Sequence, residues 1–150
     1  MPITIKDWLA PANKPRKIPT KRTYPEFEIQ KAVIKWWKQM QKYGKAPSGY
    51  ILRSNRNTQV ANSRQAGRIV AEGSVAGIPD LELSVMKQGY GGLYIELKAP
   101  NHEPKRASSN GGLSDEQIEV IDNLRKCGYR VEVCYSVDAA IKVIEEYLGL

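Results

Sequence analysis

The sequence contains little cysteine, a single histidine and no apolar run that approaches the length of a membrane span. Its two cysteines, Cys127 and Cys134, are too few and too isolated for a disulfide framework or a zinc site, so we expect both to be small apolar residues. The first residues also lack the basic region and apolar core of a secretory signal. The sequence therefore predicts a cytoplasmic protein without a membrane anchor or structural disulfides.

Acidic residues are absent from a long stretch of the chain. None occurs between Glu28 and Glu72, where nine basic residues are found, whereas residues 115–150 hold eight acids and four bases. Binding along a nucleic-acid backbone requires a positive half of this kind, although lysines on the outer face of a helix explain part of it. The acidic C-terminal half is either a dimer surface or simply solvated.

The first 25 residues differ in composition from the rest. They hold five of the nine prolines, and six basic residues against one acid. We expect residues 1–23 to form a flexible, basic, proline-rich arm that either follows a phosphate backbone or contacts a partner subunit. The chain is 41% hydrophobic, enough for a core, and residues 24–150 are predicted to form one domain.

Residues 79–85 and 93–98 alternate apolar and polar side chains, which predicts two strands with one buried face. The connector from Met86 to Gly92 contains three glycines and favours a hairpin turn between them. The polar face carries Asp80, Glu82, Glu96 and Lys98. Two or more carboxylates and an amine are therefore predicted to share one surface.

This polar grouping has two interpretations. Acidic and basic residues on a strand face are commonly a solvated, salt-bridged surface. Hard divalent cations, however, prefer carboxylate oxygens, so an Asp and a Glu from neighbouring strands also suit a metal site with room for phosphate. A lysine on the same face can orient a water molecule or stabilise an oxyanion. Under the second interpretation, these residues supply the groups that metal-assisted phosphodiester hydrolysis needs.

Helix signals flank these strands. Thr23 and Glu26 have the spacing of a capping box for a helix that ends near Tyr43, and Ser114 and Gln117 have the same spacing for a later helix. With further helices near 60–72 and 136–148, the elements run helix, strand, helix, strand, strand, helix, strand, helix. This order predicts an α/β fold with a mixed central sheet and helices on both sides.

Several motifs together resemble a known family. Pro79-Asp80, followed after fifteen residues by Glu96-Leu97-Lys98, looks like the PD-(D/E)XK nuclease signature. Residues 26–30 (EFEIQ), 76–81 (AGIPDL), 95–100 (IELKAP), 113–117 (LSDEQ) and 128–133 (GYRVEV) follow the order and spacing of the VRR-NUC family, the virus-type replication and repair nucleases. The resemblance covers about residues 24–148 and implies a restriction-endonuclease-like core.

The resemblance also implies a mechanism. Asp80, Glu96 and the Leu97 carbonyl would bind Mg²⁺ or Mn²⁺, and Lys98 would position the attacking water. Glu26 would complete the metal site, unless it only caps its helix. Gln117 would lie beside the active centre, although capping alone also explains it. No organic cofactor is expected.

DNA is the expected partner. Arg64 and Arg68, one turn apart, suit phosphate contacts, although surface ion pairing also explains them. The full set of expected DNA-binding residues is Arg53, Arg56, Arg64, Arg68, Lys105 and Arg106. A homodimer and a branched, Holliday-junction-like substrate are expected from the family, as is a phage or prophage origin. The competing hypothesis is a non-catalytic DNA-binding or assembly module with the same fold.

Overall fold

The computed structural model describes residues 25–55 and 63–150. The predicted N-terminal arm, the Thr23 cap and Arg56 lie outside the described residues. None of the helices in the described ranges is long and apolar enough to cross a membrane.

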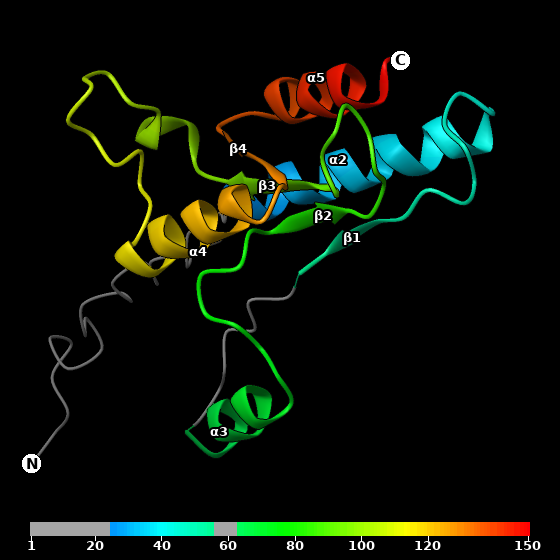
Figure 1. Ribbon diagram of the computed structural model, residues 1–150. Coiled ribbons are helices and arrows are strands. Elements are labelled where there is room, and N and C mark those ends of the chain that lie inside the picture. The colour runs from blue at the N-terminus through cyan, green and yellow to red at the C-terminus, as the bar shows by residue number, and fades with distance from the viewer. Residues whose placement is uncertain (1–24, 56–62) are drawn as a thin grey trace, which may run out of the picture.

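A four-stranded mixed sheet forms the centre of the fold (Figure 1). The strands lie in the order β1 (Leu52–Ser54), β2 (Leu81–Leu83), β3 (Leu93–Leu97) and β4 (Arg130–Cys134). Strand β2 is antiparallel to both β1 and β3, whereas β4 runs parallel to β3. The predicted order of elements and the mixed α/β sheet are confirmed.

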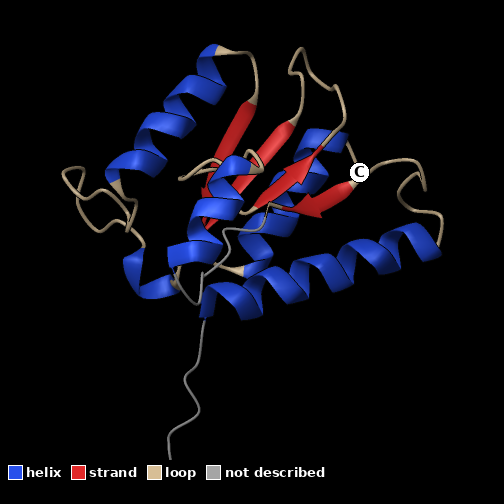
Figure 2. Cartoon of the chain, turned by 90° about the horizontal axis from the view of Figure 1, so that it is seen from below, coloured by secondary structure: helices blue, strands red, loops and turns tan. Residues whose placement is uncertain are grey.

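Helices cover both faces of this sheet (Figure 2). Helix α2 (Pro25–Lys42) and helix α5 (Val137–Leu148) pack with the inward side chains of β2 and β3 in one core. Helix α4 (Asp115–Lys126) contacts β4 on the other side and buries Ile121. The polar face of the β2–β3 hairpin therefore lies on the α4 side and is not a simple solvated surface.

The β2–β3 pairing follows the predicted alternation. Leu81 lies opposite Ile95 and Leu83 opposite Leu93, and all four are fully buried. The connector turns at Gln88 and Gly89, which have φ of 53° and 83°, and the residues on either side of them pair as an isolated bridge. Strand β2 is shorter than predicted because the amide of Val85 bonds to the carbonyl of Leu83 and turns the backbone away.

The two cysteines have different environments. Cys134 is buried in the core with Leu97 and Ile144, as predicted. Cys127 is exposed at the C-terminal end of α4, so the prediction that it fills apolar space was wrong. Its position beside Gly128, where the chain turns from α4 toward β4, places it outside the packed layers.

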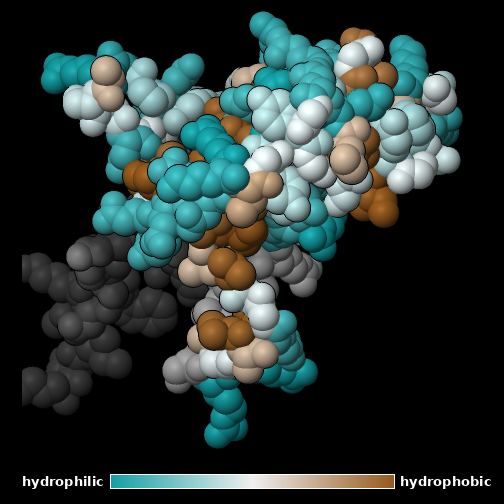
Figure 3. All heavy atoms as spheres, in the orientation of Figure 1, coloured by the Kyte–Doolittle hydropathy of each residue, from teal (hydrophilic) through white to brown (hydrophobic). Residues whose placement is uncertain are grey.

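Helix α3 (Ser63–Ala71) projects away from the sheet in Figure 1. Val70 and Val75, on and just after this helix, are 70% and 53% exposed. Figure 3 shows apolar atoms along α3 and the segment that joins it to the body. The segment returns to the core at Gly77.

Gly77 brings this returning segment against the start of α4. Its φ is +79°, and a Cβ built there would lie 2.6 Å from the carbonyl oxygen of Glu116. Only a residue without a side chain allows the two backbones to approach this closely. The contact sets the distance between the entrance to β2 and the first turn of α4.

We predict that Gly77→Ala destabilises the fold by more than backbone strain alone. The matched control is Gly128→Ala, because Gly128 has φ of +88° and nothing within 4 Å of its built Cβ. Urea unfolding should show a loss of roughly 1–2 kcal/mol for the control and about 1–3 kcal/mol more for Gly77→Ala, owing to overpacking. Equal losses in the two variants would contradict the close approach.

Candidate active site

Asp80 is fixed at the start of β2 by backbone groups on both sides. Its Oδ2 accepts a hydrogen bond of 2.8 Å from the amide of Leu97 on β3. The amide of Asn55 donates to the Asp80 carbonyl at 2.8 Å, and the Asn55 side chain donates to the Pro79 carbonyl at 3.1 Å. The carboxylate is therefore held against the end of β3, facing position 96.

Glu96 is the buried acid of the site. The residue is 1% exposed, and its Oε1 lies 3.1 Å from Lys98 Nζ and accepts a hydrogen bond from Gln117 Nε2. Its Oε2 is buried without a hydrogen-bond partner in the described part of the chain. Buried carboxylate oxygens are nearly always satisfied, so an unpartnered one fits a group that the protein itself does not supply, such as a bound cation.

Gln117 joins helix capping to the site. Ser114 Oγ accepts from the Gln117 amide at 3.2 Å, and Gln117 Oε1 accepts from the Ser114 amide at 3.0 Å, which confirms the predicted capping box. The same Oε1 accepts from Lys98 Nζ at 2.9 Å, while Nε2 donates to Glu96. The two explanations considered for Gln117 therefore coexist in one side chain.

Glu26 reaches the same place from the first turn of α2. It is exposed, but its Oε1 accepts a hydrogen bond of 3.3 Å from the amide of Ala99, just beyond Lys98. Its negative charge raises the pKa of both other acids of the site. The structure thus brings together Glu26, Asp80, Glu96, Lys98 and Gln117, the five side chains that the sequence singled out.

The electrostatics of the site disfavour two bare carboxylates. Burial, the charge of Asp80 and the charge of Glu26 raise the pKa of Glu96 to about 7, against the opposing effect of Lys98. Burial also raises the pKa of Asp80, although the Leu97 amide and Lys98 act in the other direction. One lysine does not balance this much negative charge, so the site favours an additional cation.

The donor set fits a hard divalent cation. The described residues contain no group of three or more His, Cys, Asp or Glu side chains placed to hold a metal, so a closed protein cage of the zinc type is not formed there. Two carboxylates with one free oxygen match the smaller protein contribution typical of Mg²⁺, which retains several waters and binds substrate phosphate.

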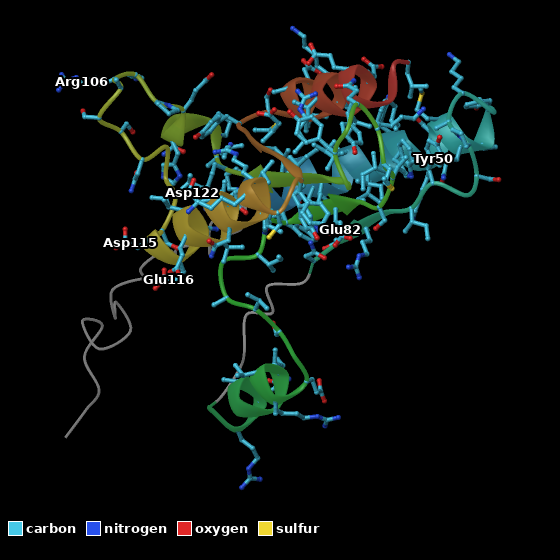
Figure 4. The ribbon with its side chains drawn as sticks, viewed as in Figure 1. Tyr50, Glu82, Arg106, Asp115, Glu116 and Asp122 are labelled. Carbon is cyan, nitrogen blue, oxygen red and sulfur yellow. The ribbon has the colours of Figure 1, made fainter. Side chains whose placement is uncertain are left out.

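The expected DNA-binding residues that the structure describes lie on separate elements: β1, α3 and the loop before α4. Arg53 is paired with Glu82 at 2.7 Å, and Arg68 with Glu72 at 2.8 Å. Arg64 is exposed on α3. Lys105 and Arg106 are exposed in the loop before α4, and Figure 4 shows Arg106 at the outer tip of that loop.

Sequence reasoning missed two features around the site. Asn55 gave no signal, because its bonds to Pro79 and Asp80 depend on the pairing of β1 with β2. The lysines of α2 were interpreted as part of a basic stretch and as the solvated outer face of a helix, and no groove beside them was expected. Their spacing at Lys31, Lys35, Lys38 and Lys42 places them on one helix face and was available in the sequence.

We predict that Glu96 makes the stability of the metal-free protein depend on pH. A carboxyl with a raised pKa stabilises the folded state below its usual pKa, and this contribution is lost as pH rises through about 7. In EDTA, wild type should lose at most about 3 kcal/mol relative to Glu96→Gln between about pH 5 and about pH 8. Denaturant unfolding measures this difference, and parallel pH profiles for the two proteins would contradict it.

Comparison with known proteins gives consistent matches. A family model described as the VRR-NUC domain matches residues 24–138. A solved structure described as a VRR_NUC domain protein is similar over 86% of this chain and 92% of that chain, with 26% sequence identity and a TM-score of 0.59. The comparison with curated proteins gives no match.

Proposed function

The chain belongs to the VRR-NUC family of nucleases, and from this premise we propose that it is a divalent-metal-dependent endonuclease that hydrolyses phosphodiester bonds in DNA. The observation that carries the proposal is the buried Glu96 carboxylate, which keeps one oxygen free beside Asp80 and has Lys98 at 3.1 Å from the other. This combination suits metal-assisted hydrolysis and has no evident use in a purely structural hairpin.

Each residue of the site has a proposed role. Asp80 and Glu96 would hold Mg²⁺ or Mn²⁺ together with the Leu97 carbonyl, and Glu26 would add a ligand or support the others from α2. When bound, the cation lowers the pKa of water and neutralises charge on the phosphate. Lys98 Nζ lies 3.1 Å from Glu96 Oε1, and from there it would orient the attacking water and stabilise developing negative charge.

Gln117 acts as a positioning residue. Its amide holds Glu96 with one end and Lys98 with the other, so both functional groups keep a single orientation. Because the same amide belongs to the α4 capping box, the orientation is tied to a rigid helix end.

The proposal for the kind of DNA that is cut rests on the resemblance to the family. Stand-alone domains of this kind resemble Holliday-junction resolvases, which act as homodimers with one site for each of two strands. We therefore propose a branched substrate and a homodimer, in phage or prophage replication, recombination or repair. Arg53, Arg64, Arg68, Lys105 and Arg106 are exposed and stay candidates for contacts with DNA outside the site.

The competing proposal is a DNA-binding or assembly module without activity. It would need no acids at the site, whereas in this chain Asp80 and Glu96 interact electrostatically and Lys98 lies 3.1 Å from one oxygen of Glu96. The other oxygen of Glu96 is buried without a hydrogen-bond partner among the described residues. That arrangement favours the enzyme. The two proposals differ in whether any substrate is cut in the presence of a metal.

We predict that Asp80→Asn lowers DNA cleavage by at least about 100-fold, because one of the two metal-binding carboxylates is lost. Glu82→Gln is the matched control, since Glu82 lies on the same hairpin but is held by Arg53. The assay uses a linear duplex, a 5′ flap and a four-way junction, each with Mg²⁺, Mn²⁺ or EDTA.

Cleavage should depend on metal, persist in Glu82→Gln and disappear in Asp80→Asn, while DNA binding is retained in both. Wild-type cleavage by Asp80→Asn would overturn the assignment of the site. Binding without cleavage of any substrate in either metal would instead support the non-catalytic module.

A further inference from the structure

A groove of about 950 Å³ runs between α2 and β1 and ends at Asp80. Its two sides are joined by a hydrogen bond of 2.9 Å from Gln30 Nε2 to Ser54 Oγ. Asp80 is the one residue of the proposed metal site that lines the groove, and the groove follows α2 toward its C-terminal end at Lys42. An occupant of this groove would therefore lie next to Asp80.

The wall that α2 contributes is positively charged. Lys31, Lys35, Lys38 and Lys42 all line the groove, and Asp80 is the one acid among its described lining residues. Lys42 lies eleven positions after Lys31, a length of about 16 Å along the helix. Lys31 is paired with Glu28 at 3.3 Å, but no salt bridge to the other three occurs in the described ranges. The groove is thus a track for a polyanion.

The Asp80 end of the groove also presents an aromatic ring. Phe27 follows Glu26 in the first turn of α2, lines the groove and is 55% exposed. Lys31 Nζ lies 5.3 Å from the centre of its ring. Ile34 and Leu52 continue the apolar surface beside it. An exposed ring among lysines is the combination that binds single strands, whose unpaired bases offer free faces for stacking.

We propose that this groove holds a single-stranded segment of the substrate, with its phosphates along the α2 lysines and one base stacked on Phe27. This inference rests on the proposed nuclease function and narrows its substrate to DNA with an unpaired strand next to the cut, such as a flap or an opened branch. A duplex cannot use Phe27 in this way, because its bases are already stacked on one another. The basic N-terminal residues are a poor alternative occupant, since they carry the same sign of charge as the groove.

The test measures binding separately from cleavage. Anisotropy of a labelled 20-nucleotide oligo-dT and of a labelled duplex is followed in EDTA over a series of salt concentrations. The groove variants are Phe27→Ala and the double variant Lys35→Ala/Lys38→Ala. The matched control is Lys126→Ala/Lys142→Ala, which removes the same charge from exposed positions on α4 and α5.

Phe27→Ala should weaken oligo-dT binding by about 5-fold to 100-fold, the loss of one stacked base, and leave duplex binding unchanged. The double groove variant should reduce the salt slope for oligo-dT by about 1.4, the release expected for two single-strand phosphate contacts. The control variant should change the affinity for oligo-dT by no more than about 2-fold and leave the salt slope unchanged. Equal effects of the groove and control variants, or no effect of Phe27→Ala, would overturn the proposal.

Two further outcomes separate this inference from its premise. If the groove variants lose oligo-dT binding but the wild type cuts nothing in any metal, the groove assignment stands and the nuclease proposal fails. If the wild type cuts DNA and the groove variants bind oligo-dT normally, the nuclease proposal stands and the groove assignment fails. A second copy of the chain is the other possible occupant of the groove, and sedimentation of the same variants tests for it. If the groove variants dissociate a dimer but bind oligo-dT normally, the groove is an interface between copies and the proposal is overturned.

Discussion

The other contacts of the site follow from the burial of one carboxyl group, that of Glu96. Its charged form is costly to bury unless that form is paired and hydrogen-bonded, and Glu96 is 1% exposed. Lys98 and Gln117 satisfy one of its oxygens, and the other has no partner in the described part of the chain. The fold therefore holds this carboxylate in a state that a cation completes. A site of this kind gives up stability for function.

Several contacts of the backbone position the groups around Glu96. Gly77 lets the first turn of α4 approach the entrance to β2, so that the capping glutamine of α4 reaches the acid on β3. Asn55 and the Leu97 amide fix Asp80 against the neighbouring strand. None of these contacts is catalytic in itself. Together they place groups from four separate segments of the chain around one small volume, which is the preorganisation that electrostatic catalysis requires.

Local patterns in the sequence predicted much of this. Alternation along residues 79–85 and 93–98 predicted the hairpin and the common face of its acids, and the spacing of Ser114 and Gln117 predicted the start of α4. Both signals act within one strand pair or one helix turn. The burial of Glu96 could not be predicted in this way, because it depends on α4 packing over a face that the alternation indicated only as polar.

Contacts between segments that are distant in the sequence could not be predicted from local patterns either. Glu26 and Ala99 are 73 residues apart, and Arg53 meets Glu82 only because β1 pairs with β2. That pairing also places an acid beside Arg53, a residue expected to bind DNA. The sequence shows that Arg53 is charged, but the pairing of β1 with β2 determines that Glu82 is its partner.

A crystal soaked in Mn²⁺ would show directly whether Asp80 and Glu96 form a divalent-cation site. Anomalous scattering locates Mn²⁺ without reference to activity. We expect a peak between the Asp80 carboxylate and the unpartnered oxygen of Glu96 in the wild type, and none at that position in Asp80→Asn. A wild-type crystal that binds Mn²⁺ elsewhere but leaves the space between these two carboxylates empty would contradict this expectation.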